Sequence, residues 1–187
     1  MGGLTIDDVE LVYLGHPQLA LAITNHAIDA AFITEPNATN ALRQGQAVRF
    51  LRGDEVYPGQ QLSVVLYAGS FAKSAPEVAR KFMLAYVRAA RDYNDALSDG
   101  RLAGPKADEI IGILTASTAV KDPAIYRAII PHGCNPDGAV DLASLKQDLA
   151  FFRRNGLIKA DISVEQTLDP SFAEAAVATL GPYRAAH

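Results

Sequence analysis

The chain has 187 residues, of which 49% are hydrophobic and 20% are charged, a composition typical of a folded globular protein. Its formal net charge of -4 and its pI near 5.5 argue against binding to nucleic acid, because domains that bind nucleic acid carry a basic surplus. No apolar run approaches the roughly 20 residues that a membrane-spanning helix requires. The single cysteine, Cys134, excludes an internal disulfide and a zinc cluster built from cysteines.

The first third of the chain alternates between short apolar runs and amphipathic segments. The apolar runs are compact and without helical period, and they predict strands over residues 9–14, 29–33, 47–51 and 62–67. Between the first three of these, the spacing of apolar residues predicts helices over residues 18–26 and 36–43, the second of which ends before Gly45. This order is typical of consecutive βαβ units and a parallel sheet.

From Ser74 onward the pattern is helical. Ser74 and Glu77 have the spacing of a capping box, and they predict the start of a long helix that Gly100 ends. Its predicted apolar stripe comprises Val78, Phe82, Ala85, Tyr86, Ala89, Tyr93 and Leu97.

Four further helices have recognisable start signals. They are predicted to begin at Pro105, at Asp122-Pro123, at Asp141 and at Asp169-Pro170. Amphipathic helices must bury their apolar stripes, yet this part of the chain has no predicted strands for them to cover. We therefore expect the sheet that they cover to belong to a part of the protein outside this chain or to another copy of it.

Polar residues at the ends of the predicted strands are the candidates for a binding site, because ligands of open α/β sheets bind outside the carboxyl ends of the strands. Thr34, Glu35 and Asn37 follow the second strand, His16 follows the first, and Gln61 precedes the fourth. A plain strand-to-helix turn is the alternative interpretation. Backbone N–H groups at the helix starts favour an anion. The Glu35 carboxylate favours a cationic or N–H-bearing ligand, or holds a neighbouring side chain, and the sequence does not decide between these.

No pattern in the sequence predicts catalysis, a metal or a cofactor. The four histidines (His16, His26, His132 and His187) lack the spacing of a helical zinc site, and we interpret them as surface or capping residues. Cys134 is interpreted as a buried loop thiol. The nucleophile motif Gly-x-Ser-x-Gly and the glycine-rich phosphate loops do not occur.

Three runs of residues resemble a known family. The runs are AIDAAFITEP, ALRQGQAV and SFAKSAPEVARKFMLAYVRAARDYNDAL, and the similarity extends from Val9 to Tyr183. They resemble substrate-binding proteins of bacterial ABC importers of the nitrate, sulfonate and taurine class, which includes relatives that bind pyrimidine precursors of thiamine. The family usually has glycine where His26 stands, and we expect His26 to adopt the left-handed backbone conformation.

The resemblance implies an incomplete α/β fold of the type II periplasmic-binding-protein kind, in which this chain corresponds to the C-terminal part only. Residues 1–61 would be the latter part of the second lobe, residues 62–69 the crossing strand and hinge, and residues 70–187 the helices that cover the first lobe. The residues that match the family's cleft are Thr34, Glu35 and Asn37, with weaker support for His16 and Gln61.

The function implied by the resemblance is non-catalytic binding of a small polar or anionic solute, followed by docking on ABC permease subunits. A periplasmic location follows from the resemblance, although Met1–Leu4 do not have the start of a signal peptide. The alternatives are an enzyme of pyrimidine synthesis, the ligand-sensing domain of a regulator, and a truncated form that covers its exposed helix faces as a homo-oligomer. The sequence does not choose among nitrate, sulfonates, taurine, aromatic acids and pyrimidines.

Overall fold

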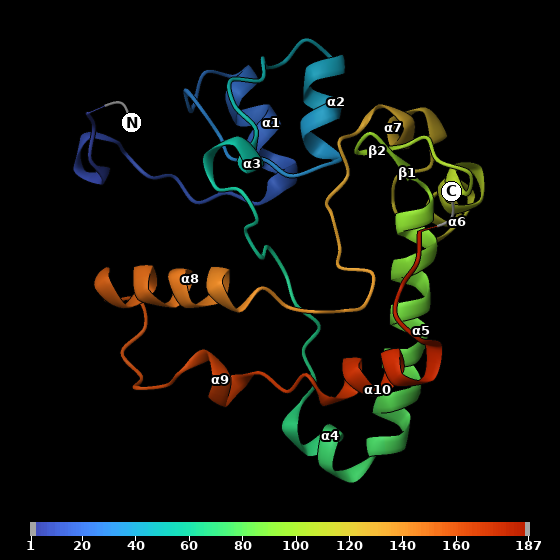
Figure 1. The fold of residues 1–187 in the computed structure, drawn as a ribbon. Coiled ribbons are helices and arrows are strands. Elements are labelled where there is room, and N and C mark those ends of the chain that lie inside the picture. The colour runs from blue at the N-terminus through green and yellow to red at the C-terminus, as the bar shows by residue number, and fades with distance from the viewer. Residues whose placement is uncertain (1–2, 186–187) are drawn as a thin grey trace.

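The computed structural model describes residues 3–185, so the interpretation of His187 as a surface residue lies outside the described residues. The described chain is mainly helical, with one short hairpin (Figure 1). Its helices are the 3-10 helix η1 (Ile6–Asp8), α1 (His16–Thr24), α2 (Asn37–Arg43), α3 (Gly53–Val56), α4 (Gly69–Ser74), α5 (Pro76–Asp95), α6 (Ala107–Ser117), α7 (Pro123–Ala128), α8 (Leu142–Arg154), α9 (Val164–Thr167) and α10 (Ser171–Leu180). Its strands are β1 (Leu97–Ser98) and β2 (Arg101–Leu102).

The prediction of a parallel sheet in the first third is wrong for the described residues. The four predicted strands run as unpaired chain, and between residues 3 and 185 the sheet consists of β1 and β2 alone. Apolar and β-branched residues favour an extended backbone, but a strand forms only where a neighbouring strand takes up its N–H and C=O groups. The exposed fraction of Val48 is 91% and that of Leu66 is 84%, so these runs also lack a packing partner.

The hairpin β1–β2 follows α5 directly, where the sequence predicted only the end of the helix. Leu97 pairs with Leu102 in antiparallel register, and the turn residues Asp99 and Gly100 have φ angles of 49° and 70°. Two central residues with positive φ make the turn that Asp-Gly favours in two-residue hairpins. The Asp-Gly pair was therefore a local signal for this hairpin.

Helix α5 buries a different face from the predicted one. Val78 and Phe82 of the predicted stripe are 57% and 54% exposed, whereas Ala79, Val87 and Ala90 are buried. Helix α10 packs across α5 (Figure 1). The predicted capping box is also wrong, because Ser74 is the last residue of α4 and the N-cap of α5 has no side-chain hydrogen bond.

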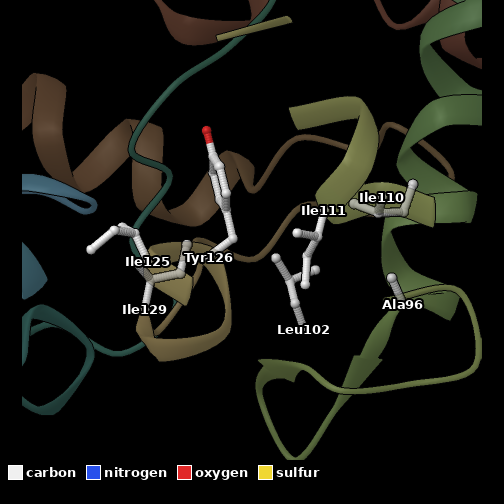
Figure 2. Close-up of a cluster of buried hydrophobic side chains, with 7 residues drawn as sticks. All are labelled: Ala96, Leu102, Ile110, Ile111, Ile125, Tyr126 and Ile129. Carbon is white, nitrogen blue, oxygen red and sulfur yellow. The ribbon is translucent and has the colours of Figure 1, made fainter. Parts of the chain in front are cut away.

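The main cluster of buried hydrophobic side chains lies at the C-terminal end of α5, between the hairpin, α6 and α7. Its members are Ala96, Leu102, Ile110, Ile111, Ile125, Tyr126 and Ile129 (Figure 2). Of the large side chains in the described chain, Val87 alone is fully buried. The members of the main cluster come from residues 96–129, and none of them lies in α1, α3 or α8.

The other predicted helix ends are confirmed where a side chain or a glycine sets them. The Asp122 carboxylate accepts from the backbone N–H of Ala124 at 2.8 Å, and the Asp141 carboxylate accepts from that of Ser144 at 3.0 Å. Gly181 follows α10 with φ 73°. His26 has φ 55°, the left-handed conformation expected at this position. The predicted boundaries at residues 61–62 and 69–70 stay predictions.

Candidate functional site

Thr34, Glu35 and Asn37 lie together at the turn that leads into α2. The Glu35–Pro36 peptide bond is cis, and Asn37 is the first residue of the helix. The Glu35 side chain is only 9% exposed, and its Oε2 accepts a hydrogen bond from the backbone N–H of Thr39 at 2.9 Å. A carboxylate at this place satisfies a free N–H group of the first turn and faces the positive end of the helix dipole.

Arg49 is the partner of Glu35. Its Nη2 donates to Glu35 Oε1 at 3.3 Å, and the Arg49 side chain is 35% exposed. Both oxygens of Glu35 are thus engaged within the chain. A guanidinium group has five N–H donors in a planar fork, so Arg49 keeps donors that can bind a planar or tetrahedral oxyanion.

Arg49 was missed in the sequence because it lies inside the third predicted strand. The run Ala47–Leu51 was interpreted as an apolar strand, and its one charged residue was not considered as a site residue. A charged side chain within an apolar run is itself a signal, because such a charge needs a partner.

His16 and Gln61 do not join Glu35. His16 is the exposed first residue of α1, and between residues 3 and 185 no hydrogen bond or ion pair links it to Glu35 or Arg49. The structure therefore brings three of the five candidate residues together at one turn.

Gln61 binds instead to the start of α8. Its backbone N–H donates to Ser144 Oγ at 2.8 Å, and its side-chain Oε1 accepts from the backbone N–H of Asp141 at 2.9 Å. Its side-chain Nε2 donates to the carbonyl oxygen of Ser63 at 2.7 Å. With both ends of its amide engaged, Gln61 fixes the chain before residue 62 to α8.

A shallow hollow lies at the opposite end of α2, beside the connection between α6 and α7. Asn40, Arg43 and Gln44 line it from α2, and Val120 and Lys121 line it from the connection. The Lys121 ammonium donates to the carbonyl oxygens of residues 115 and 116, which end α6. The residues that line the hollow do not include Thr34, Glu35 or Asn37.

Cys134 lies in a half-buried environment. Asn94 Nδ2 donates to its Sγ at 3.4 Å, and burial raises the pKa of the thiol. A raised thiol pKa lowers the fraction of reactive thiolate at neutral pH. Across the described part of the chain, no group of three or more metal-ligating side chains could hold a metal ion. Within the same residues, no helix is both long and apolar enough to span a membrane.

The first half of the chain defines the class of protein. Helices alternate there with apolar runs that have no strand partner, and the Glu35 turn follows one of these runs. A family model described as NMT1/THI5 like matches residues 1–96, and the chain belongs to this family of nitrate, sulfonate, taurine and thiamine-precursor binding proteins.

Family membership gives the coarse fold and the general role. The family has an α/β fold of the periplasmic-binding-protein kind, its members bind substrates, and they are typically periplasmic. The match includes Glu35 and Arg49 and ends at Ala96, directly after α5, so the resemblance suggested for residues 97–183 lies outside it. No curated protein and no solved structure matches the chain.

Proposed function

We propose that the chain is the solute-binding component of a bacterial ABC import system for a small anionic solute of the nitrate, sulfonate and taurine type. The observation that carries this proposal is the family match over residues 1–96, within which the Glu35 turn and Arg49 lie. The role is non-catalytic and periplasmic, and the partners are a small-molecule ligand and the permease subunits of the importer.

The geometry around Arg49 supports an anionic solute. Glu35 is nearly buried and holds one edge of the guanidinium, while the Arg49 side chain remains partly exposed. An arginine whose position is fixed by a carboxylate loses little conformational entropy when it binds an oxyanion through its remaining donors. In the sequence, Glu35 favoured a cationic partner and the helix starts favoured an anion. This arrangement accounts for both, because the Glu35 carboxylate positions the Arg49 guanidinium and the guanidinium binds the anion.

Transport by such a component works through a shift in conformational populations. A ligand that binds the closed arrangement more tightly than the open one favours closure, by as much as its affinities for the two differ. Closure then presents the surface that docks on the permease. Arg49 would supply part of this differential affinity.

A pyrimidine precursor of thiamine is the second candidate ligand. Two exposed aromatic side chains favour it, because Phe32 is 67% exposed and Phe50 is 90% exposed, and Phe50 adjoins Arg49 in sequence. Exposed aromatic rings can stack on a planar heterocycle.

The test is calorimetric titration of the full chain with nitrate, taurine, an alkanesulfonate and an aminopyrimidine. We expect the Arg49→Ala variant to bind the oxyanion about ten- to a hundredfold more weakly, the effect of losing a hydrogen bond to a charged group. The control is Arg88→Ala, which removes an exposed arginine from α5 and should leave affinity unchanged.

The results separate the candidate ligands. Binding of the aminopyrimidine alone, with weaker binding by Phe50→Ala and no effect of Arg49→Ala, would support the second candidate. Binding of none of the four probes, or equal loss in both arginine variants, would contradict the proposed function.

A further inference from the structure

The sequence contains dipeptides in which an aspartate or an asparagine precedes a glycine. They are Asp99-Gly100, Asp137-Gly138 and Asn155-Gly156. Such a dipeptide can close into a five-membered ring, because the glycine nitrogen lies within reach of the preceding Cγ and glycine has no Cβ to obstruct the approach. Ring closure needs a side chain that can turn and a backbone N–H that is not held elsewhere, so hydrogen bonds at either group oppose it.

Asp99 and Gly100 form the exposed turn between β1 and β2. Within residues 3–185, the Asp99 carboxylate takes part in no hydrogen bond or ion pair. Gly100 lies outside the two paired strands, and its backbone N–H donates to no group in the described chain. Both reacting groups of this dipeptide are therefore free.

Asp137-Gly138 is the same dipeptide with both groups held. The Asp137 carboxylate accepts from Arg91 Nη2 at 2.6 Å and from the backbone N–H of Tyr183 at 3.2 Å. The backbone N–H of Gly138 donates to the carbonyl oxygen of Asn135 at 3.0 Å. The folded chain thus protects this dipeptide from ring closure.

Asn155-Gly156, after α8, is held in a similar way. Asn155 Nδ2 donates to the carbonyl oxygen of Phe151 at 2.8 Å, and the backbone N–H of Gly156 donates to that of Arg153 at 2.9 Å. The fold therefore leaves the turn at Asp99 as the reactive one of these dipeptides.

We propose that Asp99 is a modification site at which the chain isomerises spontaneously to isoaspartate. The Gly100 nitrogen attacks Cγ of the protonated Asp99 carboxyl and loses its proton, a carboxyl oxygen leaves as water, and a succinimide ring closes. Water then opens the ring. Addition at Cγ restores aspartate, whereas addition at the former backbone carbonyl of Asp99 gives isoaspartate, whose main chain runs through Cβ and Cγ and whose α-carboxylate is free. The water lost in the first step is regained in the second, so the mass of the chain is unchanged.

The modification acts on the main hydrophobic cluster. Isoaspartate lengthens the main chain of the turn by one carbon atom, and the length of a hairpin loop sets the register of its strands. The pairing of Leu97 with Leu102 is therefore disturbed. Leu102 is 3% exposed and belongs to the cluster (Figure 2), so a change in an exposed turn lowers the stability of the core.

The first test compares the two Asp-Gly dipeptides in one protein. The full chain is kept folded at neutral pH and physiological temperature and then digested with trypsin, which releases residues 92–101 and 128–146 as separate peptides. Isoaspartate is detected by enzymatic methylation of its free α-carboxylate and is located by fragmentation of the peptide.

We expect isoaspartate to accumulate severalfold faster at Asp99 than at Asp137 in the folded protein. In urea the two dipeptides should react at similar rates, because the bonds that protect Asp137 are then lost. Equal accumulation at both positions in the folded protein, or isoaspartate at neither, would overturn the proposal.

The second test uses two substitutions at Asp99. Asp99→Gly cannot form the ring, and glycine accepts the φ angle of 49° at this position, so the hairpin is retained. After the same incubation, the unaltered protein should unfold at a lower urea concentration than before, and Asp99→Gly should not change.

Asp99→Asn keeps the turn and should react faster, since its side-chain amide leaves as ammonia. Each reaction converts a neutral amide into a carboxylate, and isoelectric focusing detects the added charge. An Asp99→Asn protein that keeps its charge, or an equal loss of stability in Asp99→Gly and the unaltered protein, would contradict the assignment.

Discussion

Removal of the Glu35 carboxylate should lower the stability of the fold, because both of its oxygens are engaged. In Glu35→Ala the backbone N–H of Thr39, a residue that is 5% exposed, loses its acceptor. A buried donor without a partner costs about 1–3 kcal/mol. The ion pair with Arg49 adds about 0.2–1 kcal/mol, since the 35% exposure of that arginine places the pair near the surface.

The expected loss in the free energy of unfolding is therefore about 1–4 kcal/mol for Glu35→Ala. Glu35→Gln keeps an oxygen that can accept from Thr39 and loses the charge, so it should cost about 0.2–1 kcal/mol. Urea denaturation, monitored by far-ultraviolet circular dichroism, measures the free energy of unfolding of both variants. The dependence of this free energy on urea concentration should stay unchanged.

A double-mutant cycle with Arg49→Ala isolates the ion pair. The coupling energy between Glu35 and Arg49 should be about 0.2–1 kcal/mol, and it should fall as the salt concentration rises. If Glu35→Ala unfolds at the same urea concentration as the unaltered protein, the carboxylate does not cap α2, and its assignment as the residue that positions Arg49 is wrong.

Two further predictions concern the core at the end of α5. Gly104→Ala should cost about 1–3 kcal/mol, because a Cβ atom there would lie 2.8 Å from the carbonyl oxygen of Asp95; Gly112→Ala, with open space around it in α6, should instead stabilise by about 0.5–1 kcal/mol. Equal effects of these two substitutions in urea denaturation would contradict the packing described at Gly104. Burial raises the pKa of Tyr93 to about 12, so the stability that this tyrosine contributes is present below pH 10 and is lost as the pH rises through about 12. Tyr93→Phe should reduce the loss of unfolding free energy between pH 10 and pH 12. If denaturation at several alkaline pH values shows the same pH dependence for this variant and for the unaltered protein, the burial assigned to the Tyr93 phenol is wrong.

Local signals in the sequence located the helix ends correctly where one side chain decides them. Asp122 and Asp141 cap α7 and α8 as predicted, because an N-cap depends on a residue and its next two or three neighbours. Gly181 and His26 have the positive φ angles expected of residues that end helices. The Asp-Gly hairpin after α5 had an equally local signal, but the apolar pattern of the preceding helix was extended over it.

Strand pairing and the choice of the buried face could not be obtained in this way, because both depend on distant residues. The apolar runs satisfy the pattern of strands, yet a strand also requires a neighbour that its own sequence does not specify. On α5, the large residues suggested one stripe, whereas the buried residues are Ala79, Val87 and Ala90, and α10 packs across this helix. At the site, the position of Glu35 could be predicted, but its partner Arg49 lies 14 residues further along the chain.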